Sequence, residues 1–319
     1  MLRYFICLLC GCFLTPVEAQ IRVLALGNSI TQGRSGFPSY RHALWEMFQA
    51  AEIEVDFVGS VNAPFLCEED ASEGFDPDHE GHWGYRIDQI LAHDGNHQNC
   101  IATTEQGGLQ QWLKGYTADI ALIHLGTNDL FQKSWFESSE SLLSTTLAEL
   151  DSVISLLRED NPRIIPYLAQ LIPVNDPSTH QLIIRYNQAL KNWALQRQSL
   201  QSPLVLVDHY SGFDWEKDTY DGVHPNAIGA KKMASKWFTA ITSPLSAAAR
   251  NAQLSHWQST VWIPERLRSA NSLTVFDKQG QIVSQSNQIP LTIDLSNWQS
   301  GLYYFVFEGP EPIVRKIWR

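Results

Sequence analysis

Short apolar runs alternate with helical patterns over the first three quarters of the chain. Residues 119–125 form the clearest run, which is almost continuously apolar, precedes Gly126 and is typical of a strand buried on both faces. Residues 138–157 instead carry apolar side chains three and four positions apart, the spacing of one helix face. The same criteria predict strands at residues 21–26, 55–58, 119–125, 164–170 and 204–208, and helices at residues 40–48, 87–91, 138–157, 180–195 and 228–241.

This alternation predicts an α/β fold. Near-continuous apolar strands separated by helices form a parallel sheet that helices cover on both faces. Such sheets bind ligands at the carboxyl ends of their strands. We therefore expect the chemistry of this protein in the loops that follow Leu26, Leu125 and Asp208.

The pattern changes near residue 242. Residues 243–253 begin with the small residues that are typical of a linker. Beyond the linker, short alternating runs occur without helix-length periodicity, which predicts a small all-β domain over residues 254–319 and leaves residues 20–242 for the α/β domain. The alternating runs lie at residues 261–263, 273–276, 281–283, 291–295 and 302–307.

The first 19 residues have the layout of an export signal. Arg3 supplies a positive charge, the apolar run of residues 4–14 is too short to span a bilayer, and residues 17–19 fit a small-x-small cleavage site. No later stretch is apolar enough to predict a transmembrane segment, so we expect export through the periplasm to the cell surface or the medium. Residues 9–12 also resemble a loose lipobox, so lipoprotein anchoring at Cys12 is the alternative.

Composition and charge exclude several classes of protein. The 319 residues include 11 Trp, 10 Tyr and 14 Phe, too many aromatic side chains for a disordered chain. A net charge of −11 without a basic patch argues against a nucleic-acid binder. Residues 250–319 contribute seven basic and five acidic side chains, so this stretch carries +2 and the rest of the chain carries −13.

Only two cysteines remain after cleavage of the predicted signal. Cys67 and Cys100 flank a stretch rich in glycine and proline, and an oxidising compartment would favour a disulfide between them. The alternative is two unpaired cysteines that act as small apolar residues.

Polar residues of catalytic type follow the predicted strands. Residues 27–31 place Ser29 on a sharp strand-to-helix turn, which exposes the hydroxyl beside backbone N–H groups, although a helix N-cap would explain this serine nearly as well. Residues 126–129 follow another strand, and there Asn128 can donate its amide N–H into the same cleft or form an Asx turn. Asp221 precedes His224 by three residues, so its carboxylate can reach the imidazole and fix its tautomer, or the pair is a solvated loop.

In this order and spacing, the three motifs resemble the SGNH (GDSL-like) hydrolases over roughly residues 21–240. Gly27-Asn-Ser-Ile matches the nucleophile block, Gly126-Thr-Asn-Asp the oxyanion asparagine block and Asp221-x-x-His224 the base block. The oxyanion glycine falls within residues 80–90, where position favours Gly84 over Gly81. Residues 76–90, with residues 55–59 upstream, look like carbohydrate esterase family 3, the acetyl xylan esterase group.

The resemblance implies a flavodoxin-like three-layer α/β/α fold and a cofactor-free, metal-free serine esterase. Ser29 would be the nucleophile, His224 the base and Asp221 its orienting carboxylate. The oxyanion hole would consist of the Ser29 and Gly84 backbone N–H groups and the Asn128 side chain. The implied substrate is acetylated polysaccharide; the alternatives are an esterase or lysophospholipase acting on lipid or small acyl esters, and an inactive glycan-binding protein.

One departure from the family pattern lies beside the nucleophile. Asn28 stands where the first block usually has Asp, which removes a negative charge and keeps the shape of the side chain. We expect an active enzyme with an altered local potential, and the alternative is a decayed one.

The residues around Gly84 allow two interpretations each. The rings of Trp83 and Tyr85 flank it and would stack on sugar rings or pack in the core. A run of metal-ligand residue types precedes it, for which we expect a solvated loop bordering the cleft rather than a metal site, because the residues are nearly consecutive. The run comprises Asp76, Asp78, His79, Glu80 and His82.

The predicted β domain has a resemblance of its own. Residues 273–280, 291–295, 300–305 and 314–317 look like the C-terminal sorting domain of type IX secretion cargo, a small β-sandwich found in Bacteroidota. This resemblance implies the type IX machinery as a partner. A carbohydrate-binding module is the competing interpretation, and it needs a rim of exposed aromatic side chains.

Overall fold

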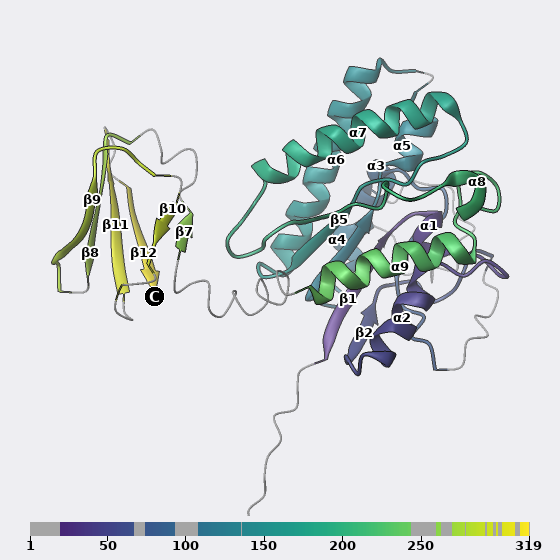
Figure 1. Ribbon diagram of the computed structural model, residues 1–319, viewed down its shortest axis with the longest axis horizontal. Coiled ribbons are helices and arrows are strands. Elements are labelled where there is room, and N and C mark those ends of the chain that lie inside the picture. Colours follow the sequence, from purple (N-terminus) through teal and green to yellow (C-terminus); the bar gives the residue numbers. More distant parts are fainter. Residues whose placement is uncertain are drawn as a thin grey trace, which may run out of the picture.

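The computed structural model describes residues 20–66, 74–92, 108–134, 136–243, 260–262, 270–277, 279–290, 292–295, 298, 302–309 and 313–318 (Figure 1). The predicted export signal, Cys12, the predicted pair Cys67 and Cys100, and residues 244–253 of the predicted linker lie outside the described residues. No helix in the described part of the chain is long and apolar enough to cross a membrane.

A parallel sheet forms the centre of the larger unit, which confirms the predicted fold class. Its strands run in the order β2-β1-β4-β5-β6, and the short β3 pairs with the end of β1. All of these pairings are parallel, and β4 and β5 are buried at every position. The bounds are β1 (Ile21–Gly27), β2 (Val55–Val58), β3 (Glu80–Gly81), β4 (Ile120–His124), β5 (Ile165–Ala169) and β6 (Val205–Val207).

Helices cover both faces of this sheet. Apolar side chains of α3, α4, α5, α6 and α7 pack in one core cluster, and those of α2 and α9 pack in another (Figure 1). The predicted helices are present, and α1 follows the expected strand-to-helix turn at Ser29. The short α4, α5 and α8 were not predicted. The bounds are α1 (Ser29–Gln32), α2 (Tyr40–Ala50), α3 (Ile87–Ala92), α4 (Gly108–Trp112), α5 (Thr127–Gln132), α6 (Ser139–Asp160), α7 (Pro177–Gln196), α8 (Trp215–Asp218) and α9 (Ala227–Thr242).

The C-terminal unit consists of antiparallel strands, as predicted. One sheet has the strand order β12-β11-β8-β9, and β7 pairs with β10. Alternate side chains of β8 and β11, among them Val275 and Phe305, are buried in a small core of their own. The bounds are β7 (Thr260–Trp262), β8 (Ser272–Asp277), β9 (Ile282–Ser286), β10 (Thr292–Asp294), β11 (Leu302–Glu308) and β12 (Ile313–Trp318).

Candidate active site

Ser29 lies where the first strand of the sheet turns into a short helix. β1 ends at Gly27, Asn28 caps α1, and the Asn28 side-chain oxygen accepts a hydrogen bond from the backbone N–H of Ile30 at 3.0 Å. Asn and Asp are equally good at a helix N-cap, so asparagine preserves this turn without the charge. Ser29 is the first residue of the helix and is 7% exposed.

The imidazole of His224 lies within hydrogen-bond distance of Ser29. Its Nε2 is 2.9 Å from the Ser29 Oγ, and its Nδ1 is 2.8 Å from Oδ2 of Asp221. The other carboxylate oxygen of Asp221 accepts the backbone N–H groups of Val223 and His224 at 3.0 and 2.8 Å. The fold therefore brings together two residues 195 positions apart, in the arrangement of a nucleophile, a base and an orienting carboxylate.

The environment of Asp221 keeps its carboxylate ionised. Partial burial alone would raise the pKa of Asp221, but the hydrogen bonds from the backbone and ring of His224 outweigh burial and lower it. A carboxylate that stays charged at neutral pH can stabilise an imidazolium at its neighbour.

The loop that carries Gly84 is attached directly to the serine turn. β3 pairs with the end of β1, and the backbone N–H of His82 donates to the carbonyl of Gly27 at 3.0 Å. The Trp83 N–H donates to Oε1 of Gln32 in α1 at 2.9 Å. Gly84 follows with a φ of 79°, a conformation that favours glycine.

Gly81 has a different reason to be glycine. A Cβ at this position would lie 2.6 Å from the backbone nitrogen of Gln32, so close packing of β3 against α1 excludes a side chain. Gly84 has open space around its Cα. These surroundings are consistent with the choice of Gly84 over Gly81 for the oxyanion glycine, which stays a prediction.

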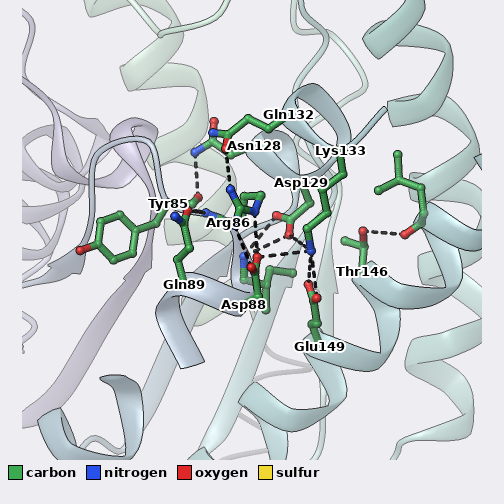
Figure 2. Close-up of polar contacts among 12 residues, drawn as sticks. Tyr85, Arg86, Asp88, Gln89, Asn128, Asp129, Gln132, Lys133, Thr146 and Glu149 are labelled. Carbon is green, nitrogen blue, oxygen red and sulfur yellow. Dashed lines mark hydrogen bonds and ion pairs between the residues drawn. The ribbon is translucent and has the colours of Figure 1, made fainter. Parts of the chain in front are cut away.

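Helix α5 fastens this loop to the end of β4 (Figure 2). The Asn128 Nδ2 donates to the carbonyl of Tyr85 at 2.8 Å, and the Gln132 Nε2 donates to the carbonyl of Gly84 at 3.0 Å. The next residue of α5, Asp129, is buried, and its carboxylate accepts the backbone N–H of Ile87, the first residue of α3, at 3.1 Å. Three side chains of one short helix thus contact the backbone of residues 84–87, which holds the loop with Gly84 against α5.

A partly buried ionic network lies next to these contacts (Figure 2). The Lys133 Nζ is 2.9 Å from Glu149, 3.3 Å from Asp88 and 3.7 Å from Asp129. These three carboxylates are the one group among the described residues whose spacing would suit a metal ion, and the lysine ammonium already lies among them. Burial raises the pKa of Asp129 well above its ordinary value. Sequence reasoning missed this network, although Asp129 and Lys133 have the i,i+4 spacing of a helical ion pair.

Aromatic rings stack in a row that includes the His224 imidazole. The Trp83 ring lies parallel to it at 4.8 Å and 15°, and Phe65 stacks on Trp83 at 4.2 Å. Tyr220 is parallel to the imidazole at 5.6 Å and 14°, and Phe37 lies 4.0 Å from Tyr220. These contacts restrict rotation of the imidazole and place the Trp83 ring beside His224. Contact between Trp83 and a sugar ring stays a prediction.

Tyr85 does not share that position. Its side chain is 3% exposed and belongs to the core cluster beneath α3 to α7, while only its backbone carbonyl faces Asn128. The Tyr85 ring therefore packs in the core, which was the alternative to sugar stacking.

The run of metal-ligand residue types was expected to be a solvated loop, and this prediction is wrong for its last three members. His79, Glu80 and His82 are fully buried. The Glu80 carboxylate accepts the Ser60 hydroxyl at 2.6 Å, the Tyr116 hydroxyl at 2.5 Å and the His82 Nε2 at 2.7 Å. These hydrogen bonds replace the contacts that the buried polar groups would make with water, and they hold β3 in place. The nearly consecutive positions of the residues in the sequence do not reveal these partners.

Two further histidines lie beneath the site. His124, at the end of β4, and His209 are fully buried. In both rings, Nδ1 and Nε2 have no hydrogen-bond partner among the described residues. Burial lowers the pKa of His124 from 6.5 to about 4, and that of His209 falls well below its ordinary value for the same reason.

Acid should therefore destabilise the fold through His124. Between about pH 6.5 and pH 4 the unfolded chain protonates this imidazole and the folded chain does not, so its contribution to stability is lost as the pH falls. When the pH falls from 7 to 5, the free energy of unfolding should decrease in both proteins, and the decrease should be about 2 kcal/mol smaller in His124→Leu than in the parent protein. Urea unfolding at both pH values measures this, with Leu122→Met on the same strand as the packing control; an equal loss in His124→Leu contradicts it.

Comparisons with known proteins agree with this geometry. Residues 25–232 match the GDSL-like Lipase/Acylhydrolase family. A multidomain esterase of Ruminococcus flavefaciens is 30% identical over 243 residues, which are 74% of this chain and 30% of that protein. The chain thus spans about a third of the length of this curated relative.

Solved structures give the same result. An acetyl esterase mutant with acetate ion and a carbohydrate esterase family 3 protein from Talaromyces cellulolyticus each match at 26% identity and a TM-score of 0.57, over 73% of this chain and 100% and 99% of theirs. A family 3 carbohydrate esterase of Clostridium thermocellum matches at 25% identity and 0.56, over 72% of this chain and 100% of its own. The chain therefore belongs to the GDSL-like lipase/acylhydrolase family.

Proposed function

We propose that this protein is a carbohydrate esterase that removes O-acetyl groups from polysaccharide through an acyl-enzyme on Ser29. The observation that carries the proposal is the hydrogen-bonded series from the Ser29 Oγ to His224 at 2.9 Å and from His224 to Asp221 at 2.8 Å. Nucleophilic catalysis by serine requires an adjacent general base that takes the hydroxyl proton and a third group that orients this base, and His224 and Asp221 lie where these two roles need them.

The reaction follows from this geometry in two steps. The Ser29 Oγ attacks the ester carbonyl carbon while the Nε2 of His224 takes its proton, and collapse of the tetrahedral intermediate returns that proton to the departing sugar oxygen. A water molecule then attacks acetyl-Ser29 with His224 again as base, which releases acetate and regenerates the serine. The Asn128 amide and the backbone N–H groups of Ser29 and Gly84 stabilise the oxyanion in both steps.

Support for an acetylated glycan comes from two directions. Three solved structures at 25% or 26% identity are named as an acetyl esterase and as family 3 carbohydrate esterases. Phe37 lies at the end of the row of rings beside His224 and is 38% exposed, so it offers an apolar ring of the kind that sugars contact.

Acetate release measured in parallel tests this proposal. We expect acetate from at least one of acetylated xylan, acetylated chitooligosaccharide and O-acetylated pectin, at a higher kcat/KM than for a short-chain lysophospholipid. Hydrolysis of the lipid alone would contradict the glycan substrate. Failure to hydrolyse any ester, including p-nitrophenyl acetate, would contradict the enzyme and favour an inert binding protein.

The C-terminal unit is proposed to direct the esterase to the type IX secretion machinery after export through the periplasm. The support is its small antiparallel sheet and the basic residues of β12, Arg315 and Lys316. A secreted protein that still carries this unit, observed by intact mass, would count against sorting.

A further inference from the structure

A hollow lies next to the helix that carries Asn128. It has a volume of about 490 Å³ and is formed by the end of α5, the start of α6 and the first turns of α7. We call it the α5–α7 pocket. The residues that matter below are Phe131, Ser134, Ser139, Ser178, Gln181 and Arg185.

The α5–α7 pocket opens at the same edge of the sheet as Ser29. Helix α5 begins at Thr127 directly after β4, and α7 begins at Pro177 shortly after β5, so both start at the carboxyl ends of parallel strands. Phe131 follows Asn128 by three residues on one helix, and side chains at this spacing are neighbours. The pocket is therefore adjacent to the predicted oxyanion donor.

The loop that enters α7 also contacts the catalytic turn. The backbone N–H of Asn175 donates to the carbonyl of Gly222 at 2.8 Å, and Gly222 lies between Asp221 and His224. When an ester group of a polymeric substrate is bound at Ser29, the units of the polymer on the Asn128 side would thus lie near the α5–α7 pocket.

The chemistry of the pocket suits a sugar ring. Phe131 exposes 36% of its surface, a large apolar ring facing solvent. The hydroxyls of Ser139 and Ser178 and the Gln181 amide offer donors and acceptors around it, and the Ser134 hydroxyl, which donates to the Phe131 carbonyl at 3.2 Å, offers an acceptor. A sugar presents the same combination, an apolar face bordered by hydroxyl groups.

Charge restricts the occupant further. Arg185 donates to Glu140 at 2.7 Å, and its guanidinium has five N–H donors, so this pair does not exhaust it. The Asp176 carboxylate accepts the Thr179 N–H at 2.7 Å and caps α7. Both charges thus have a partner, and the N–H groups that Arg185 retains can donate to the hydroxyl groups of a neutral sugar.

We propose that the α5–α7 pocket is a subsite for a further sugar unit of the glycan whose acetyl ester is held at Ser29, with Phe131 stacking on that sugar. The inference rests on the proposed function and narrows its substrate class to acetylated oligomers and polymers. It assigns to Phe131 a role in substrate length preference, because a ring at this place contacts sugar units beyond the acetylated one.

Acetylated xylotetraose compared with the acetylated xylose monomer, both assayed for acetate release, tests the subsite. We expect the parent protein to prefer the tetrasaccharide, and Phe131→Ala to reduce this preference in kcat/KM about fivefold, mainly by raising KM for the tetrasaccharide. Phe131→Tyr, which keeps the ring, should retain the preference. Leu195→Ala, which removes another exposed apolar side chain at the far end of α7, is the matched control and should also retain it.

The outcomes separate this inference from the proposed function. Equal losses on both sugars in Phe131→Ala, or an unchanged preference, would overturn the subsite while the esterase stands. If the parent protein hydrolyses p-nitrophenyl acetate but releases acetate from none of acetylated xylan, acetylated chitooligosaccharide and O-acetylated pectin, the glycan substrate is wrong and the subsite falls with it.

Discussion

Replacing Ser29 with alanine should lower kcat for p-nitrophenyl acetate by about 10⁴-fold or more, which is the typical cost of losing the nucleophile in a serine hydrolase. The reason is that the Ser29 Oγ forms the only covalent bond to the acyl group in the proposed mechanism, and His224 is aligned with that atom at 2.9 Å. Initial rates and a burst of p-nitrophenol in the parent protein measure the effect.

His224→Ala provides the matched comparison. Since the two residues act as a unit, the double variant should be no slower than either single variant within about threefold. Thermal unfolding shows whether the variants remain folded, and removing one oxygen from Ser29 leaves the helix cap at Asn28 intact. Turnover by folded Ser29→Ala near the parent rate would exclude the acyl-enzyme mechanism.

Asn128→Ala should lower kcat by about 10²–10³, the usual cost of deleting one oxyanion donor. The Asn128 amide has two N–H groups, and one of them donates to the carbonyl of Tyr85 at 2.8 Å. The other can then donate to the oxyanion, and the loss should fall on kcat because the charge develops only in the transition state.

Gln132→Ala distinguishes this role from a structural one. Gln132 donates from the same helix to the carbonyl of Gly84 at 3.0 Å, so its loss also loosens the loop but removes no predicted oxyanion donor. We expect Gln132→Ala to lower kcat less than about tenfold. Similar losses in the two variants would mean that Asn128 only positions the loop.

The sequence already contained most of the fold of the larger unit. The run at residues 119–125 and the spacing over residues 138–157 predicted β4 and α6 because burial on both faces leaves a continuous apolar signal and burial of one helix face leaves a periodic one. Helix α5, which positions the site, carries neither signal because it has only six residues and one buried apolar side chain, Leu130.

The sequence likewise predicted part of the site, and the tertiary contacts decided the rest. Short motifs made Ser29, Asn128 and the pair Asp221 and His224 candidates, and the order and spacing of the three motifs, which resemble those of the SGNH hydrolases, turned the candidates into a prediction. Which glycine stands near them, and which face each side chain presents, depends on contacts between distant segments.

By itself the sequence determined the sheet, its helices and the residue types at the strand ends, since these follow from local periodicity and turn chemistry. Only the tertiary structure decided that Tyr85 packs inward, that Glu80 is buried among hydroxyls and that α5 fastens the Gly84 loop to β4. The physical reason is that burial and hydrogen bonding between residues 40 positions apart are properties of packing, and no local pattern records them.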